Sequence, residues 1–595
     1  MIEKMRKYTF VLYHQDYENF LAELQKLGVV HIIRSCDEKT ESQTKNLELM
    51  KEYGECVKFL TKLKSTAPKQ ASPLPTKALL NKINEAREEK DKLQHSIDTV
   101  KKQIRDLSPW GHFDYDLVRK LKEYGLTIRF YTCLKNHFKP EWQEKYPLKI
   151  INEVGGILYF VVITDNGDPA LEADTFSFHQ HTLQEFEDKL KELENEQKDI
   201  DDYLYSIAPT AIEMFQDELK RLSREYEFED ALQQGKYEAE NTIRLLSGWI
   251  PVSLEQGLKD FLEKNNIIYV SEDAKPEENP PIKLRNNWFA RLFEPISKMY
   301  MLPYYDEFDL TPFFAPFFAL FFGFCNADIG YGIVIIILAV ILKLKMKNQG
   351  MRDILTLLMI FGTASIIMGW VMGSALAFDL KTIPAIKNKI LIKDNNQIFN
   401  YALLLGAIQI LFGIAIAAVK KMKKNGFKFG LSTIGTWLLL FGLTVLGSSL
   451  LGANISKVQP YIKYPIYIGL AMILLFNSPG KNIILNILNG FWLLYQIVTG
   501  YFGDILSYIR LFALSVSSAI LGFVMNSIGS QIANGIPIVG PIIFVLFMLF
   551  GHTLNIALGG LSGFVHPLRL TFVEFYKNAA FEGPGLEYKP FGKKE

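Results

Sequence analysis

The stretch GHTLNIALGGLSGFVHPLRLTFVEF, residues 551–575, is apolar enough to cross a membrane, yet polar and small residues recur along one face of it. Steps of three and four residues give one helical stripe: His552, Asn555, Gly559, Ser562, His566, Arg569 and Val573. Every member except the valine is polar or a glycine. Because lipid cannot satisfy such side chains, the pattern predicts that this face contacts protein or water.

The apolar stretch before it, GDILSYIRLFALSVSSAILGFVMN at 503–526, contains another arginine, Arg510. A charged side chain at the centre of a span costs about 3 kcal/mol or more, so it rarely faces lipid. Arg510 would reach the membrane surface only if its helix began near Ser507. Two arginines on neighbouring spans repel each other, and the acids Asp504 and Glu574 lie nearer the helix ends. We therefore expect the missing negative charge on another subunit.

Long apolar runs continue throughout the second half of the chain. They predict about eight membrane spans, at 312–325, 329–346, 353–377, 399–419, 431–453, 461–476, 501–526 and 541–573. A span needs about 20 apolar residues, so the first and sixth are short. Seven spans result if the first pair forms one re-entrant unit. Residues 484–499 are also apolar and are expected to lead into the seventh span.

The basic residues of the loops indicate which side of the membrane each end occupies. An even number of spans places both ends on one side. Ten Lys and Arg residues lie in the loops on that side, at 343–352, 420–428 and Lys481. The opposite loops hold six: Lys381, Lys387, Lys389, Lys393, Lys457 and Lys463. Since cytoplasmic loops carry the excess of basic residues, the polar half and the C-terminus are predicted to be cytoplasmic.

The first half is polar and divides into globular pieces joined by helical arms. Residues 5–34 and 251–271 are predicted to supply helices and strands to one α/β domain. Leu93, Ile97, Val100, Ile104 and Leu107 form a heptad seam, and a second seam runs from Leu183 to Ile207. A compact insert between two seams favours an antiparallel hairpin with a globular head, with an ordinary helical bundle as the alternative.

These patterns define the predicted fold class. It is an α-helical membrane protein of about eight transmembrane helices with an N-terminal cytosolic α/β–antiparallel coiled coil–α/β arm. The predicted boundaries are a proximal α/β domain at 1–75 and 245–300, coiled-coil arms at 76–108 and 181–244, a distal α/β domain at 109–180 and a transmembrane domain at 310–595.

Several classes of function find no support in the sequence. The four cysteines, Cys36, Cys56, Cys133 and Cys325, are scattered, which predicts reduced thiols rather than disulfides or a zinc site. The segment NSPGKN at 477–482 only superficially resembles a phosphate-binding loop, and no GxGxxG or HExxH motif occurs. With a net charge of +1, the chain shows no signal for nucleic acid. We expect no metal, no cofactor and no nucleotide site of its own.

At its membrane arginines the chain resembles the a subunit, also called subunit I, of V-type and archaeal A-type rotary ATPases, in a bacterial or archaeal form. The resemblance extends over essentially the whole chain. Its landmarks are SGWIP (247–251), TPFFAPFFALFFGFCNADIGYG (311–332), ALLLGAIQILFGIAIA (402–417), TGYFGDILSYIRLFALSVSSA (499–519), HTLNIALGGLSGFVHPLRLTFVEFY (552–576) and FEGPGLEYKPF (581–591). Where family members often have acidic groups before the seventh-span arginine, this chain has LLYQIVTG.

The resemblance implies a stator subunit in the plasma membrane, beside a rotating ring of small c/K-type subunits that each carry a Glu or Asp. It implies that the chain couples H⁺ or Na⁺ transport to ATP hydrolysis or synthesis, and that Arg510 and Arg569 match the family's two essential arginines. Two aqueous half-channels would reach the ring, with candidate lining residues Gln409, Tyr495, Gln496, Ser507, His552, Asn555, Ser562, His566 and Glu574. The cytosolic arm would bind peripheral-stalk subunits (E/G type) and the central-stalk collar subunit (C/d type).

Two other classes of protein remain as alternatives. A secondary ion transporter with a cytosolic coiled-coil regulatory arm would also place polar residues at mid-membrane, but it would be expected to show two repeated halves. A membrane-anchored scaffold would explain the arm but not the polar stripe of the last span.

Overall fold

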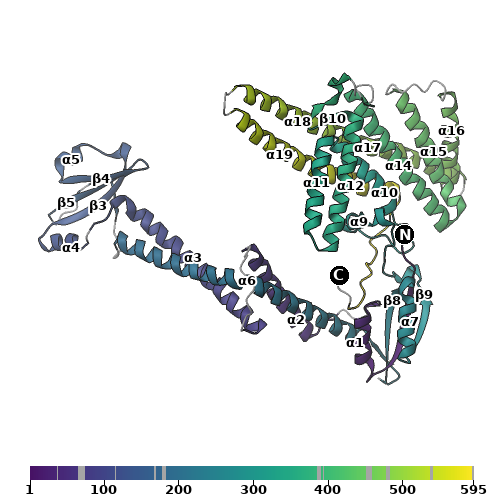
Figure 1. Ribbon diagram of the computed structural model, residues 1–595, viewed down its shortest axis with the longest axis horizontal. Coiled ribbons are helices and arrows are strands. Elements are labelled where there is room, and N and C mark those ends of the chain that lie inside the picture. The colour runs from purple at the N-terminus through teal and green to yellow at the C-terminus, as the bar shows by residue number, and fades with distance from the viewer. Residues whose placement is uncertain are drawn as a thin grey trace. The chain divides into compact units, whose positions relative to one another are not determined.

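The computed structural model of the chain contains two compact units (Figure 1). Met1–Tyr17, Lys26–Ile33 and Lys236–Glu595 form one unit, and Glu18–Gln25 with Arg34–Gly235 form the other. The structure describes residues 1–592 except 36–37, 64–73, 114, 166–168, 170, 177–181, 241, 385–389, 393, 451–458, 478–482 and 536–539. Outside the described residues lie Cys36, Lys387, Lys389, Lys393, Lys457, Lys481 and most of NSPGKN.

The second unit is built on a long helix, α6 (Leu183–Gln233), which lies beside α3 (Thr76–Leu107) (Figure 1). Gln197 of α6 donates a hydrogen bond of 2.8 Å to Gln94 of α3, and Glu194 forms an ion pair of 2.8 Å with Lys101. The residue numbers rise on one helix as they fall on the other, so the two helices are antiparallel.

A third helix of this unit, α2 (Glu41–Lys62), corrects the predicted boundary of the proximal domain. The sequence pattern predicts that residues 1–75 belong to that domain. Instead Tyr53 and Leu60 of α2 are buried in one apolar cluster with Leu204 and Phe215 of α6. An amphipathic helix is placed by whichever apolar surface covers its face, and here that surface is the arm.

The residues between the arms form a small antiparallel sheet of β3 (Thr127–Leu134), β4 (Leu148–Val154), β5 (Ile157–Thr164) and β6 (Asp174–Phe176), with the short helices α4 (Tyr115–Glu123) and α5 (Glu141–Lys145). The strand order is β4-β5-β3-β6. Gly155 and Gly156 have φ values of 61° and 80°, which a two-residue hairpin turn requires and glycine adopts without strain. Phe160 is fully buried in the core of this domain.

In the first unit, strands from both ends of the polar half share one sheet. The strand β1 (Met5–Tyr13) pairs antiparallel with β8 (Ile243–Pro251) and β9 (Ile268–Asp273). The remaining elements of this domain are β2 (His31–Ile32), β7 (Lys236–Glu238) and α7 (Glu255–Lys264), whereas most of α1 (Tyr17–Leu27) belongs to the other unit. The fully buried Tyr8 of β1 donates a hydrogen bond of 2.9 Å to Glu255 of α7, so the sheet and this helix are fixed to each other.

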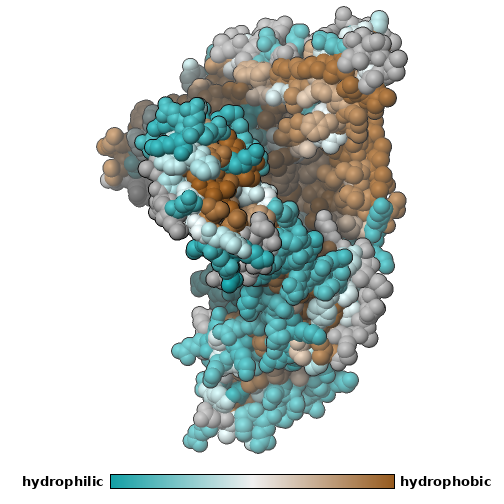
Figure 2. All heavy atoms as spheres, turned by 90° about the vertical axis from the view of Figure 1, so that its left-hand side faces the viewer, coloured by the Kyte–Doolittle hydropathy of each residue, from teal (hydrophilic) through white to brown (hydrophobic). Residues whose placement is uncertain are grey.

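The C-terminal half consists of apolar helices, and the face of it that Figure 2 shows is largely hydrophobic. After α8 (Trp288–Arg291) and α9 (Glu294–Tyr300) come α10 (Thr311–Cys325), α11 (Ile329–Lys345), α12 (Gln349–Met372), α14 (Asn395–Asn425), α15 (Phe427–Leu450), α16 (Gln459–Phe476), α17 (Ile483–Ser507), α18 (Ile509–Gly535), α19 (Gly540–Arg569) and α20 (Tyr576–Asn578). A hairpin of β10 (Ser374–Ala375) and β11 (Phe378–Asp379) follows α12, and a π-helical turn, Leu570–Phe575, follows α19.

Five described helices are long and apolar enough to cross a membrane: Gln349–Met372, Asn396–Asn425, Phe427–Ser449, Ile484–Ala533 and Gly540–Asn578. The sequence predicted about eight. The difference arises because α10 has 15 residues, α11 has 17 and the apolar part of α16 is also short. Only 17% of the apolar window is buried in each of the last two spans, against 56% in Asn396–Asn425. The last two spans therefore leave the most surface uncovered.

A buried ion pair joins the C-terminal end of α14 to the segment before α10. Lys420 Nζ lies 2.6 Å from Glu307 Oε1, and the two side chains are 9% and 2% exposed. Lys420 also donates to the carbonyl of Ala580, which follows α20. One turn later, the more exposed Lys424 pairs with Asp306 at 2.8 Å. These contacts fix the ends of α14 and α20 to the start of the membrane half.

Candidate functional site

Arg510 lies beside a one-residue interruption between α17 and α18, within the apolar helical stretch Ile484–Ala533. The sequence predicted one span at 501–526, but α17 ends at Ser507 and α18 begins at Ile509. The Ser507 hydroxyl donates a hydrogen bond of 3.3 Å to the carbonyl of Gly503, a local bond that tends to bend helices. Apolar helix continues on both sides of the break, so Arg510 does not begin an isolated span.

The two arginines lie close enough to interact electrostatically. Arg510 is half-buried and interacts with both Arg569 and Glu574. Arg569 ends α19 and its side chain is exposed. Neither guanidinium forms an ion pair within the described residues, and the buried Nη1 of Arg510 has no hydrogen-bond partner there. Two permanent positive charges thus stand near each other without a bonded carboxylate.

The two acids nearest the arginines in sequence have different surroundings. Asp504 accepts hydrogen bonds from Lys577 at 2.9 Å and from Asn578 at 2.8 Å, so its charge is already matched. Glu574 lies in the π-helical turn and is 2% exposed, and its Oε2 has no hydrogen-bond partner among the described residues. Of these two carboxylates, only Glu574 has an unused oxygen near Arg510.

The polar stripe of α19 is divided into two parts, and His552 and Asn555 belong to a closed hydrogen-bond cluster. The hydroxyl of Tyr331 lies 2.9 Å from His552 Nδ1 and accepts from Asn555 Nδ2 at 2.9 Å. His552 Nε2 lies 3.0 Å from Asn526 Oδ1. Because Asn555 donates to Tyr331, the hydroxyl proton of Tyr331 is free to point to His552. This part of the stripe joins α11, α18 and α19.

The second part of the stripe remains more open. Ser562 and His566 are half-buried, and His566 interacts electrostatically with both arginines. Between the two parts, a Cβ atom added to Gly559 would lie 2.4 Å from Oδ1 of Asn326, the residue that follows α10. Gly559 therefore allows α19 to approach the end of α10.

Gly559 and its neighbour Gly560 provide a matched test of this approach. Gly559→Ala is expected to lower the stability of the membrane half by about 1–3 kcal/mol, the usual cost of overpacking. Gly560→Ala has the same helix-forming benefit but meets no atom within 4 Å, so no loss is expected. Thermal unfolding of the purified protein in detergent measures both. Equal stability of the two variants would contradict the close approach.

The four remaining predicted residues do not form one group. Gln409 is fully buried and accepts a hydrogen bond of 2.6 Å from Tyr508, and the Ser507 hydroxyl is used by its own helix. Tyr495 is 60% exposed and stacks on Trp492. Gln496 lines a cavity. These four candidates therefore have different surroundings: Gln409 and Ser507 form hydrogen bonds inside the protein, Tyr495 lies on the surface, and Gln496 lines a cavity.

The cavity at Gln496 has a volume of about 390 Å³ and is bounded by α14, α15, α17 and α20. Its polar lining includes Lys421, Ser432, Gln496, Asp504, Lys577 and Asn578. Asn578 connects it to the π-helical turn, since its amide donates both to Asp504 and to the carbonyl of Glu574.

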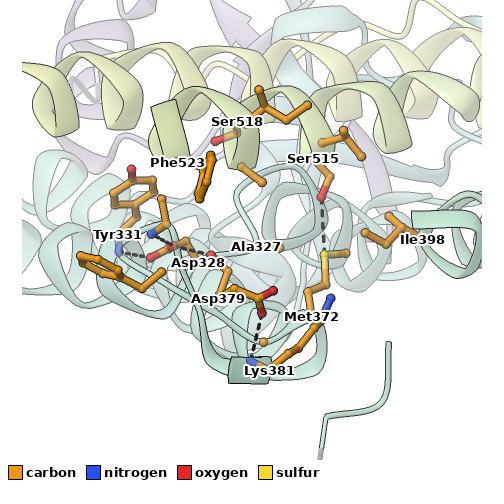
Figure 3. A pocket seen from close by; sticks show the side chains of 17 residues that line it. Ala327, Asp328, Tyr331, Met372, Asp379, Lys381, Ile398, Ser515, Ser518 and Phe523 are labelled. Carbon is orange, nitrogen blue, oxygen red and sulfur yellow. Dashed lines mark hydrogen bonds between the residues drawn. The ribbon is translucent and has the colours of Figure 1, made fainter. Parts of the chain in front are cut away.

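A second cavity, also of about 390 Å³, lies between the α10–α11 junction, the β10–β11 hairpin and α18 (Figure 3). Asp328 lies on its wall and accepts hydrogen bonds from Tyr331 N, Ser374 Oγ, Leu376 N and Ala377 N at 2.7–3.1 Å. In the sequence this segment stands out only as a family landmark, which predicts no role for Asp328 or Tyr331. An aspartate between two apolar runs was the signal that could have identified it.

The family model and the relatives found by sequence point to one family. The model of the V-type ATPase 116kDa subunit family matches residues 170–374 and 498–592. V-type ATP synthase subunit I of Borreliella burgdorferi is 27% identical over 625 aligned positions, covering all of both chains. A-type ATP synthase subunit I of Methanocaldococcus jannaschii is 26% identical over 69% of this chain and 63% of its own length. A crystal structure of the cytoplasmic N-terminal domain of subunit I, homolog of subunit a, of V-ATPase covers 45% of this chain with 15% identity and a TM-score of 0.23.

Proposed function

The chain belongs to the V-type ATPase 116kDa subunit family, and on this basis we propose that it is the membrane stator, subunit I, of a bacterial or archaeal V/A-type ATPase or ATP synthase. In this role it couples H⁺ or Na⁺ transport to ATP hydrolysis or synthesis in the plasma membrane. The observation that supports this function most strongly is the pair of arginines, Arg510 and Arg569, without a bonded carboxylate in the described residues.

The missing carboxylate is supplied by a rotating ring of small membrane subunits that carry a Glu or Asp. A ring carboxylate that faces lipid keeps its ion bound, because a bare charge there is too costly. Beside Arg510 and Arg569 the ionised carboxylate is favoured and the ion leaves. Arginine stays protonated at physiological pH and so does not relay a proton, which prevents a direct leak from one side to the other.

The surface of α18 and α19 is where such a ring would pack. In the stretches that contain them, Ile484–Ala533 and Gly540–Asn578, only 17% of the apolar window is buried, against 56% in Asn396–Asn425. Lipid alone could cover an apolar surface of this kind, but not the exposed Arg569 or the half-buried His566 beside it. The charged and polar side chains on this otherwise apolar surface therefore support a protein partner that brings an acidic group to it.

The two cavities are the best candidates for the half-channels. The loop charges place the cavity of Gln496 and Asp504 on the cytoplasmic side and the cavity of Asp328 and Tyr331 on the outer side. His552 and Asn555 then belong to the wall of the outer path, whereas Ser562, His566 and Glu574 lie nearer the arginines. The buried Glu574 Oε2 and Arg510 Nη1 without partners are suited to hydrogen bonding with water or the ring.

The remaining features complete the proposed role. Eight spans result when α10, α11 and α16 cross the membrane and α17 and α18 together form the seventh. The N-terminal half lies in the cytoplasm, where its arm binds peripheral-stalk subunits (E/G type) and the collar subunit (C/d type). ATP is turned over by other subunits.

Affinity purification through a tag on this chain tests the proposal. Gentle solubilisation of membranes is expected to recover catalytic subunits and a ring of small membrane subunits in stoichiometric amounts, and the reconstituted complex is expected to pump ions with ATP. A chain that purifies alone and transports ions down a gradient is instead a secondary ion transporter. A chain that conducts nothing and binds only soluble proteins is a scaffold.

A further inference from the structure

We propose that Tyr508 is the positioning residue for Arg510: together with Gly406 and Gln409 of α14, it fixes the point at which α17 ends and α18 begins. This inference rests on the proposed function, because it concerns how the charge of Arg510 is held in place. Tyr508 itself touches neither the ion nor the ring carboxylate.

The break at Tyr508 is held by tertiary contacts. Tyr508 N donates to the carbonyl of Ile505 at 3.0 Å, and Leu511 N donates to the carbonyl of Tyr508 at 3.0 Å, so the helix is locally tightened. No proline occurs between Ile483 and Gly535. The bond from Ser507 to Gly503 is of a kind that often bends helices, and packing around Tyr508 would set the direction of such a bend.

The Tyr508 ring fits into a space provided by a glycine of α14. Its side chain is fully buried. A Cβ atom added to Gly406 would lie 2.3 Å from Cγ of the Tyr508 ring, so any larger residue would displace the ring. Phe321 of α10 packs against the same ring at a centroid distance of 5.8 Å and an interplanar angle of 70°. The ring is thus held between α10 and α14.

The Tyr508 hydroxyl fixes the depth of the ring along α14. It donates a hydrogen bond of 2.6 Å to Gln409 Oε1, three residues after Gly406 and therefore on the same face of α14. Gln409 is fully buried, and its Nε2 has no partner among the described residues. The bond to Tyr508 is thus the hydrogen bond that holds the Gln409 side chain within the described residues, which makes Gln409 part of the support for Arg510.

This arrangement determines where Arg510 points. The Tyr508 ring is buried between Phe321 of α10 and Gly406 of α14. The half-buried Arg510 instead interacts electrostatically with Arg569 at the end of α19, so the two side chains have different neighbours. A passing carboxylate pulls on the guanidinium at every step of the ring, and α18 can turn with it only if Tyr508 leaves its space.

Tyr508→Phe tests the proposal in the purified complex, because it removes the hydroxyl and keeps the ring. The number of ions pumped per ATP hydrolysed, measured per assembled complex in proteoliposomes, is expected to fall about fivefold, as for loss of one ordinary hydrogen bond. The matched control is Tyr8→Phe, which removes another fully buried hydroxyl, bonded to Glu255 in the proximal sheet. The control should keep the normal ratio.

A role limited to folding would change the amount of complex but not this ratio. A normal ratio for Tyr508→Phe, or an equal fall for Tyr8→Phe, would overturn the proposal. If Tyr508→Phe does not assemble, Gln409→Met removes the same hydrogen bond from α14, and the same fall is expected; a normal ratio there overturns the proposal equally. Loss of coupling in Arg510→Ala with a normal ratio in Tyr508→Phe and Gln409→Met would leave the stator function intact and remove only the positioning role.

Discussion

Arg510→Ala is expected to lower ATP-driven ion pumping by at least about a hundredfold, the scale at which removal of one fixed electrostatic group affects a reaction. Without the positive charge, the ionised form of a ring carboxylate beside α18 is less stable, so the carboxylate keeps its ion bound. The complex should still assemble, because Arg510 forms no ion pair within the described residues. Pumping is measured by dye quenching in proteoliposomes that contain the purified complex, with ATP hydrolysis recorded in parallel.

Two controls sharpen this experiment. Arg352→Ala removes an exposed arginine at the start of α12, and normal pumping is expected. Arg510→Lys keeps a positive charge, but the ammonium group of lysine can lose its proton, whereas the guanidinium group of arginine does not. Reduced pumping with a proton leak is therefore expected for this variant. Normal pumping by Arg510→Ala would refute the proposed role of the arginine.

Lys420→Met is expected to destabilise the membrane half by about 3–5 kcal/mol, because it leaves the charge of Glu307 buried without its partner. Burial raises the pKa of Glu307, and the hydrogen bond and positive charge of Lys420 oppose that rise. Without Lys420 the pKa rises further, so the variant should regain stability as the pH falls and Glu307 takes up a proton. Thermal unfolding of the detergent-solubilised protein at several pH values measures both effects.

The neighbouring lysine is the matched control for this prediction. Lys424 is 46% exposed and pairs with Asp306, so Lys424→Met should cost less than about 1 kcal/mol and show little dependence on pH. The double variant Lys420→Met with Glu307→Leu should recover most of the lost stability, since both charges are then removed. A single Lys420→Met variant as stable as Lys424→Met would show that the buried pair contributes little.

The family could be identified from the sequence, and the comparisons confirm that identification. Patterns that repeat over a few turns were sufficient for the helical membrane half and for the α/β character of the polar half. The arginines and the polar stripe were also visible, because a charge or polar group within an apolar run stands out without knowledge of any partner.

The candidate half-channel residues were harder to predict. Gln409 and His552 are both polar residues within apolar helices, so the sequence placed them in one group. Gln409 instead bonds to Tyr508, and His552 belongs to a cluster with Tyr331, more than two hundred positions earlier in the chain. A polar side chain in a membrane helix can line a path or bond to a neighbouring helix, and the residue type is the same in both cases.

What the sequence determined by itself was therefore local: which segments are apolar, which faces of helices are polar, and where permanent charges lie. The tertiary structure alone decided that α2 packs in the arm, that Lys420 meets Glu307, and that the seventh span breaks at Tyr508. These features depend on the shape and hydrogen-bonding capacity of residues far away in the chain. No periodicity within a single segment records which surface that segment will meet once the chain is folded.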